Sequence, residues 1–277
     1  MCSGTGVSVT TRMTAQRLGR LIAAGDVDAV RTAVESSPHL LTRTVERNGQ
    51  GGWTPLHLAV AEGQPEVVRV LVEAGADLTS RTEFNRTPLH VALEVRRELV
   101  PLLRDLGAQV DAPSAAYLGD VEQLARHLDD GTDPGDRSSG VDLLSWASFG
   151  GAAPTAQLLL ERGADANTGA LHFAAGGARL ELVRLLLTAG ADVNRRDPAT
   201  GRTPLHAAVS AGPAGDGPEI VRMLLAAGAD VNATTTEGAS ALDISRVAAA
   251  RHRRGDAGRA SGNDALADLL LAHGANE

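Results

Sequence analysis

The sequence has very few cysteine and aromatic residues. Its one cysteine, Cys2, stands in a polar N-terminal stretch, which excludes an internal disulfide framework and a thiol-rich metal site and favours a reducing compartment. Aromatic residues make up only 2% of the chain, so the interior has to be built from leucine, valine and alanine. The sequence also lacks a run of about 18 apolar residues and a signal-peptide core within residues 1–14. We therefore expect a cytoplasmic protein without membrane attachment.

Positive charge is also in short supply. The 26 lysine and arginine residues are outnumbered by 34 aspartate and glutamate residues, which gives a formal charge of −8. A chain with this excess of negative charge has no general attraction for nucleic acid or for anionic membranes. We accordingly expect neither as a partner.

What the sequence does contain is a repeated pattern. The segment Thr-Pro-Leu-His occurs at residues 54–57, 87–90 and 203–206, and the first two copies are 33 residues apart. Each copy is followed, after a helix-length gap, by a leucine-rich stretch that ends in Gly-Ala-Asp or a close variant. This ending recurs along the chain, as at residues 75–77, 163–165, 190–192 and 228–230. A constant period of this length indicates a stacked repeat architecture.

Residues 53–85 show how one repeat is specified. Thr54 is a helix N-cap and Pro55 fits the first helical turn, where no amide donor is needed. Apolar residues at helical spacing follow, and Gly63 ends this first helix. A second helix begins near residue 65 and stops at Gly75. The remaining residues, 76–86, are too short and polar for a helix and form the turn into the next repeat.

These motifs resemble the ankyrin repeat, and the resemblance covers nearly the whole chain. It implies an all-α fold class, an α-solenoid of antiparallel helix pairs with short β-hairpin fingers. We expect a disordered tail over residues 1–14 and about eight repeats over residues 15–277. The repeats are placed at 15–48, 53–85, 86–110, 111–140, 141–168, 169–201, 202–238 and 239–277. The Ala/Arg/Gly/Asp-rich composition and the first repeat look like those of bacterial members of the family.

Three places depart from the regular repeat. The finger between Gly107 and Ala115 is nearly missing, which predicts a bend or a division into 1–110 and 111–277. Extra residues at 213–218 and 251–263 lie between the two helices of the seventh and eighth repeats. They are either tolerated flexible loops or part of a binding surface.

The recurring histidines and aspartates do not predict catalysis. His57, His90, His172 and His206 occupy equivalent positions in the first helices of their repeats, and Ser145 and Asp243 stand there in two others. Neighbouring packed helices lie roughly 8–10 Å apart. The histidines cannot share a zinc ion, whose nitrogen ligands lie at about 2.0–2.1 Å. The resemblance implies instead that each histidine bonds the neighbouring Thr-Pro turn. The aspartates after Gly-Ala are typical of turns. We therefore expect no metal, no cofactor and no enzymatic activity.

The predicted function is that of a monomeric, non-catalytic scaffold that binds a partner protein. The resemblance implies a concave groove formed by finger tips and first helices. Trp146 and Phe173 occupy a position filled by aliphatic residues in other repeats, so we expect both to be packed. The resemblance also implies that Tyr117 and Phe149 align with groove-facing positions, so both rings either contact a partner at the centre of the groove or are partly buried. An alternative is a regulatory or inhibitory accessory subunit of an enzyme. The full set of candidate partner-binding residues is Arg47, Trp53, Arg81, Phe84, Tyr117, Phe149, Arg195, Arg196 and Glu237.

Overall fold

The computed structural model of the chain describes residues 13–253 and 260–276, and it describes no side chains from 248 to 264. It divides into two compact units, Met1–Val110 and Asp111–Glu277. The boundary falls in the shortened segment between Gly107 and Ala115. Of the expected tail, residues 1–14, only 13 and 14 are described. Of the insertion at 251–263, residues 254–259 lie outside the described residues, and the rest belongs to the end of one helix and the start of the next.

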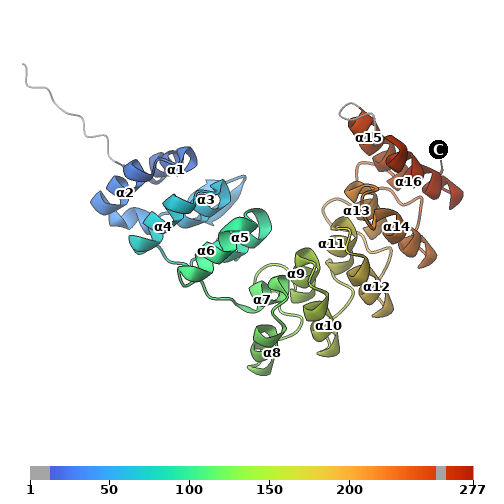
Figure 1. Cartoon of the computed structure of the whole chain (residues 1–277), viewed down its shortest axis with the longest axis horizontal. Coiled ribbons are helices and arrows are strands. Elements are labelled where there is room, and N and C mark those ends of the chain that lie inside the picture. The colour runs from blue at the N-terminus through green and yellow to red at the C-terminus, as the bar shows by residue number, and fades with distance from the viewer. Residues whose placement is uncertain (1–12, 254–259, 277) are drawn as a thin grey trace, which may run out of the picture. The chain divides into compact units, whose positions relative to one another are not determined.

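Helix pairs make up both units (Figure 1). The first unit contains α1 (Ala15–Ala24), α2 (Val27–Ser36), η1 (Pro38–Thr42), β1 (Val45–Arg47), β2 (Gln50–Trp53), α3 (Pro55–Glu62), α4 (Pro65–Glu73), α5 (Pro88–Val95), η2 (Arg97–Leu99) and α6 (Val100–Asp105). The second unit contains α7 (Ala112–Leu118), α8 (Val121–Asp129), α9 (Leu143–Gly150), α10 (Ala153–Glu161), α11 (Ala170–Gly176), α12 (Leu180–Thr188), α13 (Pro204–Ala211), α14 (Gly217–Ala226), α15 (Ala241–Arg253) and α16 (Ala260–Ala272). Each α-helix pair falls within one of the repeat spans predicted from the sequence.

Six odd-numbered helices, α3 to α13, are packed closely because they carry alanine at their central contact. The side chains at this position are at most 1% exposed: Ala59, Ala92, Ala116, Ala147, Ala174 and Ala208. A methyl group lets the neighbouring helix backbone approach, whereas a larger side chain would separate the layers. The core is therefore thin and aliphatic, which explains why it needs so few aromatic residues.

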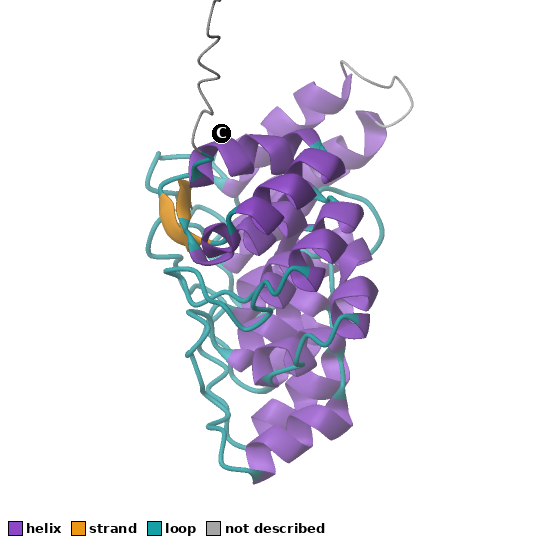
Figure 2. Cartoon of the chain, turned by 90° about the vertical axis from the view of Figure 1, so that its left-hand side faces the viewer, coloured by secondary structure: helices purple, strands orange, loops and turns teal. Residues whose placement is uncertain are grey.

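The fingers are mostly loops and not β-hairpins. Among the described residues the only two-stranded sheet is β1–β2, in which Val45 pairs with Trp53 and Arg47 with Gln50 (Figure 2). One isolated bridge joins Thr234 and Ser240. The expectation of a β-hairpin in each finger is thus too general, because side chains such as Asp77 and Asp197 accept the backbone N–H groups of their own turns.

Three asparagines connect successive repeats in the second unit. The Asn194 side chain accepts a hydrogen bond from the Asp230 backbone N–H at 2.7 Å and donates one to the Gly228 carbonyl at 3.0 Å. Asn167 accepts in the same way from Asp192, and Asn232 from Asn276. The sequence signal is Ala-Asp-x-Asn, which recurs at residues 164–167, 191–194 and 229–232. These bonds fix the spacing of the fingers that follow each helix pair.

In the part of the chain that the structure describes, every helix is too short or too polar to span a lipid bilayer.

We predict that Asn194→Ala lowers the free energy of unfolding by about 1–2 kcal/mol, because two hydrogen bonds between repeats are lost. Chemical denaturation followed by circular dichroism measures the change. Glu181→Ala, on the exposed face of α12, is the matched control and should stay within about 0.5 kcal/mol of the unsubstituted chain. Equal midpoints for all three proteins would show that the asparagine bonds do not stabilise the repeats.

Candidate functional site

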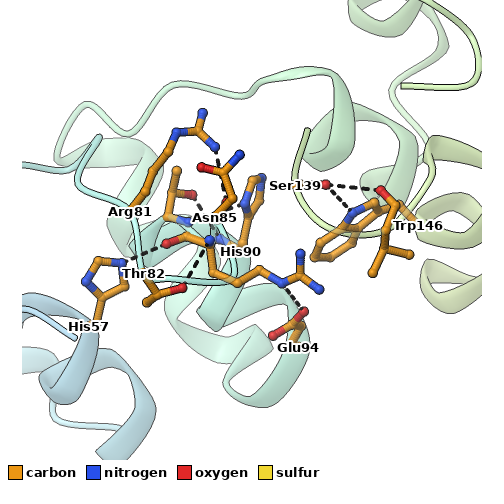
Figure 3. A network of polar contacts seen from close by, with 11 residues as sticks. His57, Arg81, Thr82, Asn85, His90, Glu94, Ser139 and Trp146 are labelled. Carbon is orange, nitrogen blue, oxygen red and sulfur yellow. Dashed lines mark hydrogen bonds and ion pairs between the residues drawn. The ribbon is translucent and has the colours of Figure 1, made fainter. Parts of the chain in front are cut away.

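The recurring histidines are structural. His57 is fully buried, and its Nδ1 accepts the Thr54 backbone N–H at 3.3 Å. Its Nε2 lies 2.9 Å from the carbonyl oxygen of Arg86 in the next repeat (Figure 3). A carbonyl oxygen only accepts, so the proton of the neutral ring is on Nε2. His206 repeats the arrangement with Thr203 and Ala239, and His172 bonds the Arg202 carbonyl at 3.0 Å.

Burial keeps these imidazoles neutral. Loss of solvation lowers the pKa of His57 from its ordinary 6.5 to about 4, although the Arg86 carbonyl favours the protonated form. The same cause lowers the pKa of His172 and His206. Among the described residues, no group of three or more His, Cys, Asp and Glu side chains could hold a metal ion.

We predict that the folded chain loses stability as the pH falls from 6.5 toward 4. The depressed pKa of His57 means that the unfolded state takes up a proton in this range before the folded state does. One such proton is worth about 1.4 kcal/mol per pH unit. His57→Gln should therefore be less stable above pH 6.5 and should lose less stability on acidification. Urea midpoints measured across the range test this, and parallel pH profiles for both proteins would contradict it.

A concave site lies in the second unit, between odd-numbered helices and fingers. This hollow of about 450 Å³ is here called the basic groove, and its principal lining residues are Arg137, His172, Phe173, Arg195, Arg196 and Arg202. Phe173 forms its apolar floor and is 39% exposed. Its neighbours on α11, Leu171 and Ala174, are buried in the core, so helical geometry turns the ring outward.

An aromatic row leads to this floor. The rings of Tyr117 on α7 and Phe149 on α9 lie 5.5 Å apart, and the Phe149 and Phe173 rings are also 5.5 Å apart. Tyr117 also meets Trp146 edge to face at 6.0 Å. The Trp146 indole N–H donates to the Ser139 hydroxyl at 2.8 Å, as Figure 3 shows. The row therefore begins in the core and ends at the surface.

The arginines of the basic groove differ in whether their guanidinium groups already bond to another part of the chain. Arg196 donates to the Thr234 carbonyl and so holds the next finger. The guanidinium groups of Arg137, Arg195 and Arg202 make no hydrogen bond or ion pair with any side chain in the described ranges. These three arginines thus line the same hollow as the Phe173 ring without an ion pair to any described side chain.

The two carboxylates of the groove are already hydrogen-bonded. Asp142 accepts from the Ser145 backbone N–H and hydroxyl, both at 2.8 Å, and so caps α9. Asp197 accepts from Thr200, which lowers the pKa of its carboxyl group. Neither is placed to act as a general base, because each carboxylate already accepts hydrogen bonds from donors in its own turn.

A second hollow of about 530 Å³ adjoins the basic groove and shares Thr200 and Arg202 with it. Its other lining residues include Glu237, Asp243 and Val247. Asp243 caps α15 by accepting from Ser240. Glu237 is exposed, so this end of the surface carries negative charge.

Two expectations about aromatic residues need correction. Tyr117 is only 5% exposed and belongs to the core, because it is enclosed by Trp146 and Phe149. Phe173 was expected to be packed but is open to solvent. Trp146, at 2% exposure, is packed as expected, and Phe149 is half-buried. Alignment of the repeats within the sequence could not tell which of these rings is exposed.

The candidates in the first unit form a separate group. Arg47 pairs with Glu62 at 3.0 Å and its guanidinium lies 5.2 Å from the centre of the Trp53 ring. Both side chains therefore hold the β1–β2 hairpin. Arg81 and Phe84 are exposed in the following finger, and Phe84 is 54% exposed.

Comparisons with known proteins agree with this architecture. A family model described as ankyrin repeats in three copies matches residues 18–114, 114–197 and 143–235. Human Rabankyrin-5 is 32% identical over 175 residues, covering 60% of this chain and 13% of that protein. The mouse B-cell lymphoma 3 protein homolog is 32% identical over 178 residues, covering 62% and 36%. Pig NF-kappa-B inhibitor alpha is 32% identical over 114 residues, covering 41% and 31%. The chain thus spans 13–36% of the length of these relatives.

Proposed function

Because the chain belongs to the ankyrin repeat family, whose repeats mediate contacts between proteins, we propose that it binds a partner protein through the basic groove and performs no catalysis. The observation that carries this proposal is the exposed Phe173 ring in a groove lined by three arginines that make no ion pair with a described side chain. Aromatic and arginine side chains supply much of the binding energy at protein interfaces. The groove is also open to solvent, whereas sites that bind small-molecule substrates usually enclose most of the ligand's surface.

The rigidity of the groove supports the same function. The finger that carries Arg195 and Arg196 is joined to the next one by hydrogen bonds, since Thr236 donates both its backbone N–H and its hydroxyl to the Thr200 carbonyl at 3.0 and 3.1 Å. Asn194 joins the bases of the same two fingers. A surface held in this way loses little conformational entropy when a partner binds.

A second candidate is that binding inhibits the partner. The observation that favours it is the similarity to proteins named as NF-kappa-B inhibitors from pig and fruit fly. An inhibitory accessory subunit would use the same groove, and it would differ from a scaffold only in that binding lowers the partner's activity.

We predict that Phe173→Ala abolishes partner capture with little loss of stability, because a partly exposed ring contributes less to folding than to a contact that buries it. The unsubstituted chain and the variant are immobilised and exposed to extract of the native cell, and retained proteins are quantified by mass spectrometry. Phe84→Ala, an exposed phenylalanine in the first unit, is the matched control. Melting temperatures confirm that all three proteins are folded.

The proposal is supported by an extract protein that the unsubstituted chain and the Phe84→Ala variant retain but the Phe173→Ala variant does not. Adding the chain to that partner then distinguishes inhibition from simple binding. A partner whose capture depends on Phe84 and not on Phe173 would place the site in the first unit and contradict the proposal.

A further inference from the structure

The surface of the second unit changes its charge along its length. The basic groove carries Arg137 and Arg195 around Phe173, whereas the adjoining hollow carries Glu237 and ends near the exposed Val247. The chain as a whole has a charge of −8. The positive end is therefore a local arrangement and not a consequence of composition.

The arginines approach the aromatic floor from two sides. Arg137 belongs to the loop that precedes α9, and Arg195 belongs to the loop that follows α12. Phe173 on α11 lies between these two segments in the chain, and all three residues line the same hollow. A chain segment that crosses the odd-numbered helices would meet one arginine before the ring and another after it.

The two carboxylates that line the groove, Asp142 and Asp197, keep their negative charges, because N–H and hydroxyl donors stabilise a carboxylate without neutralising it. Four arginines line the same groove, so its positive charges still outnumber the negative ones. Arg202 adds a further positive charge at the border between the two hollows. A carboxylate on a ligand would therefore find guanidinium donors without having to displace an existing partner among the described side chains.

We propose that the basic groove takes an extended acidic segment of a partner protein, with an apolar side chain placed over Phe173 and carboxylates on both sides of it. The proposal rests on the proposed function and specifies the partner's chemistry. At about 3.3 Å per residue, about eight residues cross three repeats that are spaced by about 10 Å. Glu237 at the far end disfavours a ligand that is uniformly anionic, such as a nucleic acid, because like charges repel at close range.

The probe is a fluorescently labelled peptide of about eight residues, with a central phenylalanine flanked on each side by aspartate and glutamate. Binding to the full chain is followed by fluorescence anisotropy. Three comparison ligands are used: the same peptide with lysine at every acidic position, the same peptide with glycine in place of phenylalanine, and a single-stranded DNA of similar length. We expect the acidic phenylalanine peptide to bind at least about tenfold more tightly than each of the others, the effect of about 1.4 kcal/mol.

Charge reversal then locates the contact. Arg195→Glu and Arg137→Glu should each weaken binding of the acidic peptide by about tenfold or more and improve binding of the lysine peptide. Arg184→Glu, on the exposed face of α12, changes the net charge by the same two units and is the matched control. It should leave both affinities unchanged within about twofold, because distant surface charges are screened. Melting curves establish that each variant is folded, and Arg137, in an exposed loop, provides a second reading if Arg195→Glu does not fold.

Three results would overturn the inference: equal binding of the acidic and lysine peptides, equal effects of Arg184→Glu and the groove variants, or tighter binding of DNA than of peptide. No measurable binding of the acidic peptide up to about 1 mM would also overturn it. These outcomes are separate from failure of the proposed function. A partner that is lost with Phe173→Ala but retained by Arg137→Glu and Arg195→Glu would preserve protein binding in the groove while rejecting an acidic ligand.

Discussion

Where a repeat carries a histidine near the start of its first helix, it depends on the bond between that neutral imidazole and a carbonyl in the following repeat, as at His57, His172 and His206. His57 receives the Thr54 N–H on one ring nitrogen and donates from the other to the Arg86 carbonyl. The same side chain therefore starts its own helix and positions the next finger. Burial favours the neutral ring, because a charged one would lose its solvation and could no longer accept the Thr54 N–H.

A second set of contacts makes the fingers of the second unit a continuous surface. Asn167, Asn194 and Asn232 each receive a backbone N–H from the next repeat. The histidines thus fix where the fingers leave the helices, and the asparagines fix the distance between them. The basic groove depends on both, because Arg195 and Arg196 are held by a finger and Phe173 by a helix. The binding surface is in this sense a product of the same bonds that stabilise the fold.

The contrast between the two units shows how similar residues take different roles. In the first unit Arg47 is paired with Glu62 and stacked near Trp53, so its charge is used within the hairpin. In the second unit Arg195 makes no ion pair with a described side chain and lines an open hollow. Whether an arginine stabilises a finger or is available to a partner thus depends on whether a nearby helix places a carboxylate within ion-pair distance of it, as α3 does with Glu62.

The sequence by itself determined the repeat period and the helix pairs, because capping residues and apolar spacing act over a few neighbouring residues. The structural role of the histidines followed from the resemblance to the ankyrin repeat. It also placed Arg195, Arg196 and Glu237 on fingers. It could not determine that Tyr117 is buried and Phe173 exposed, or that most fingers lack β-structure. The exposure of a ring depends on which side chains the adjacent repeats place against it. That is decided only when residues about 30 positions apart are brought into contact by stacking.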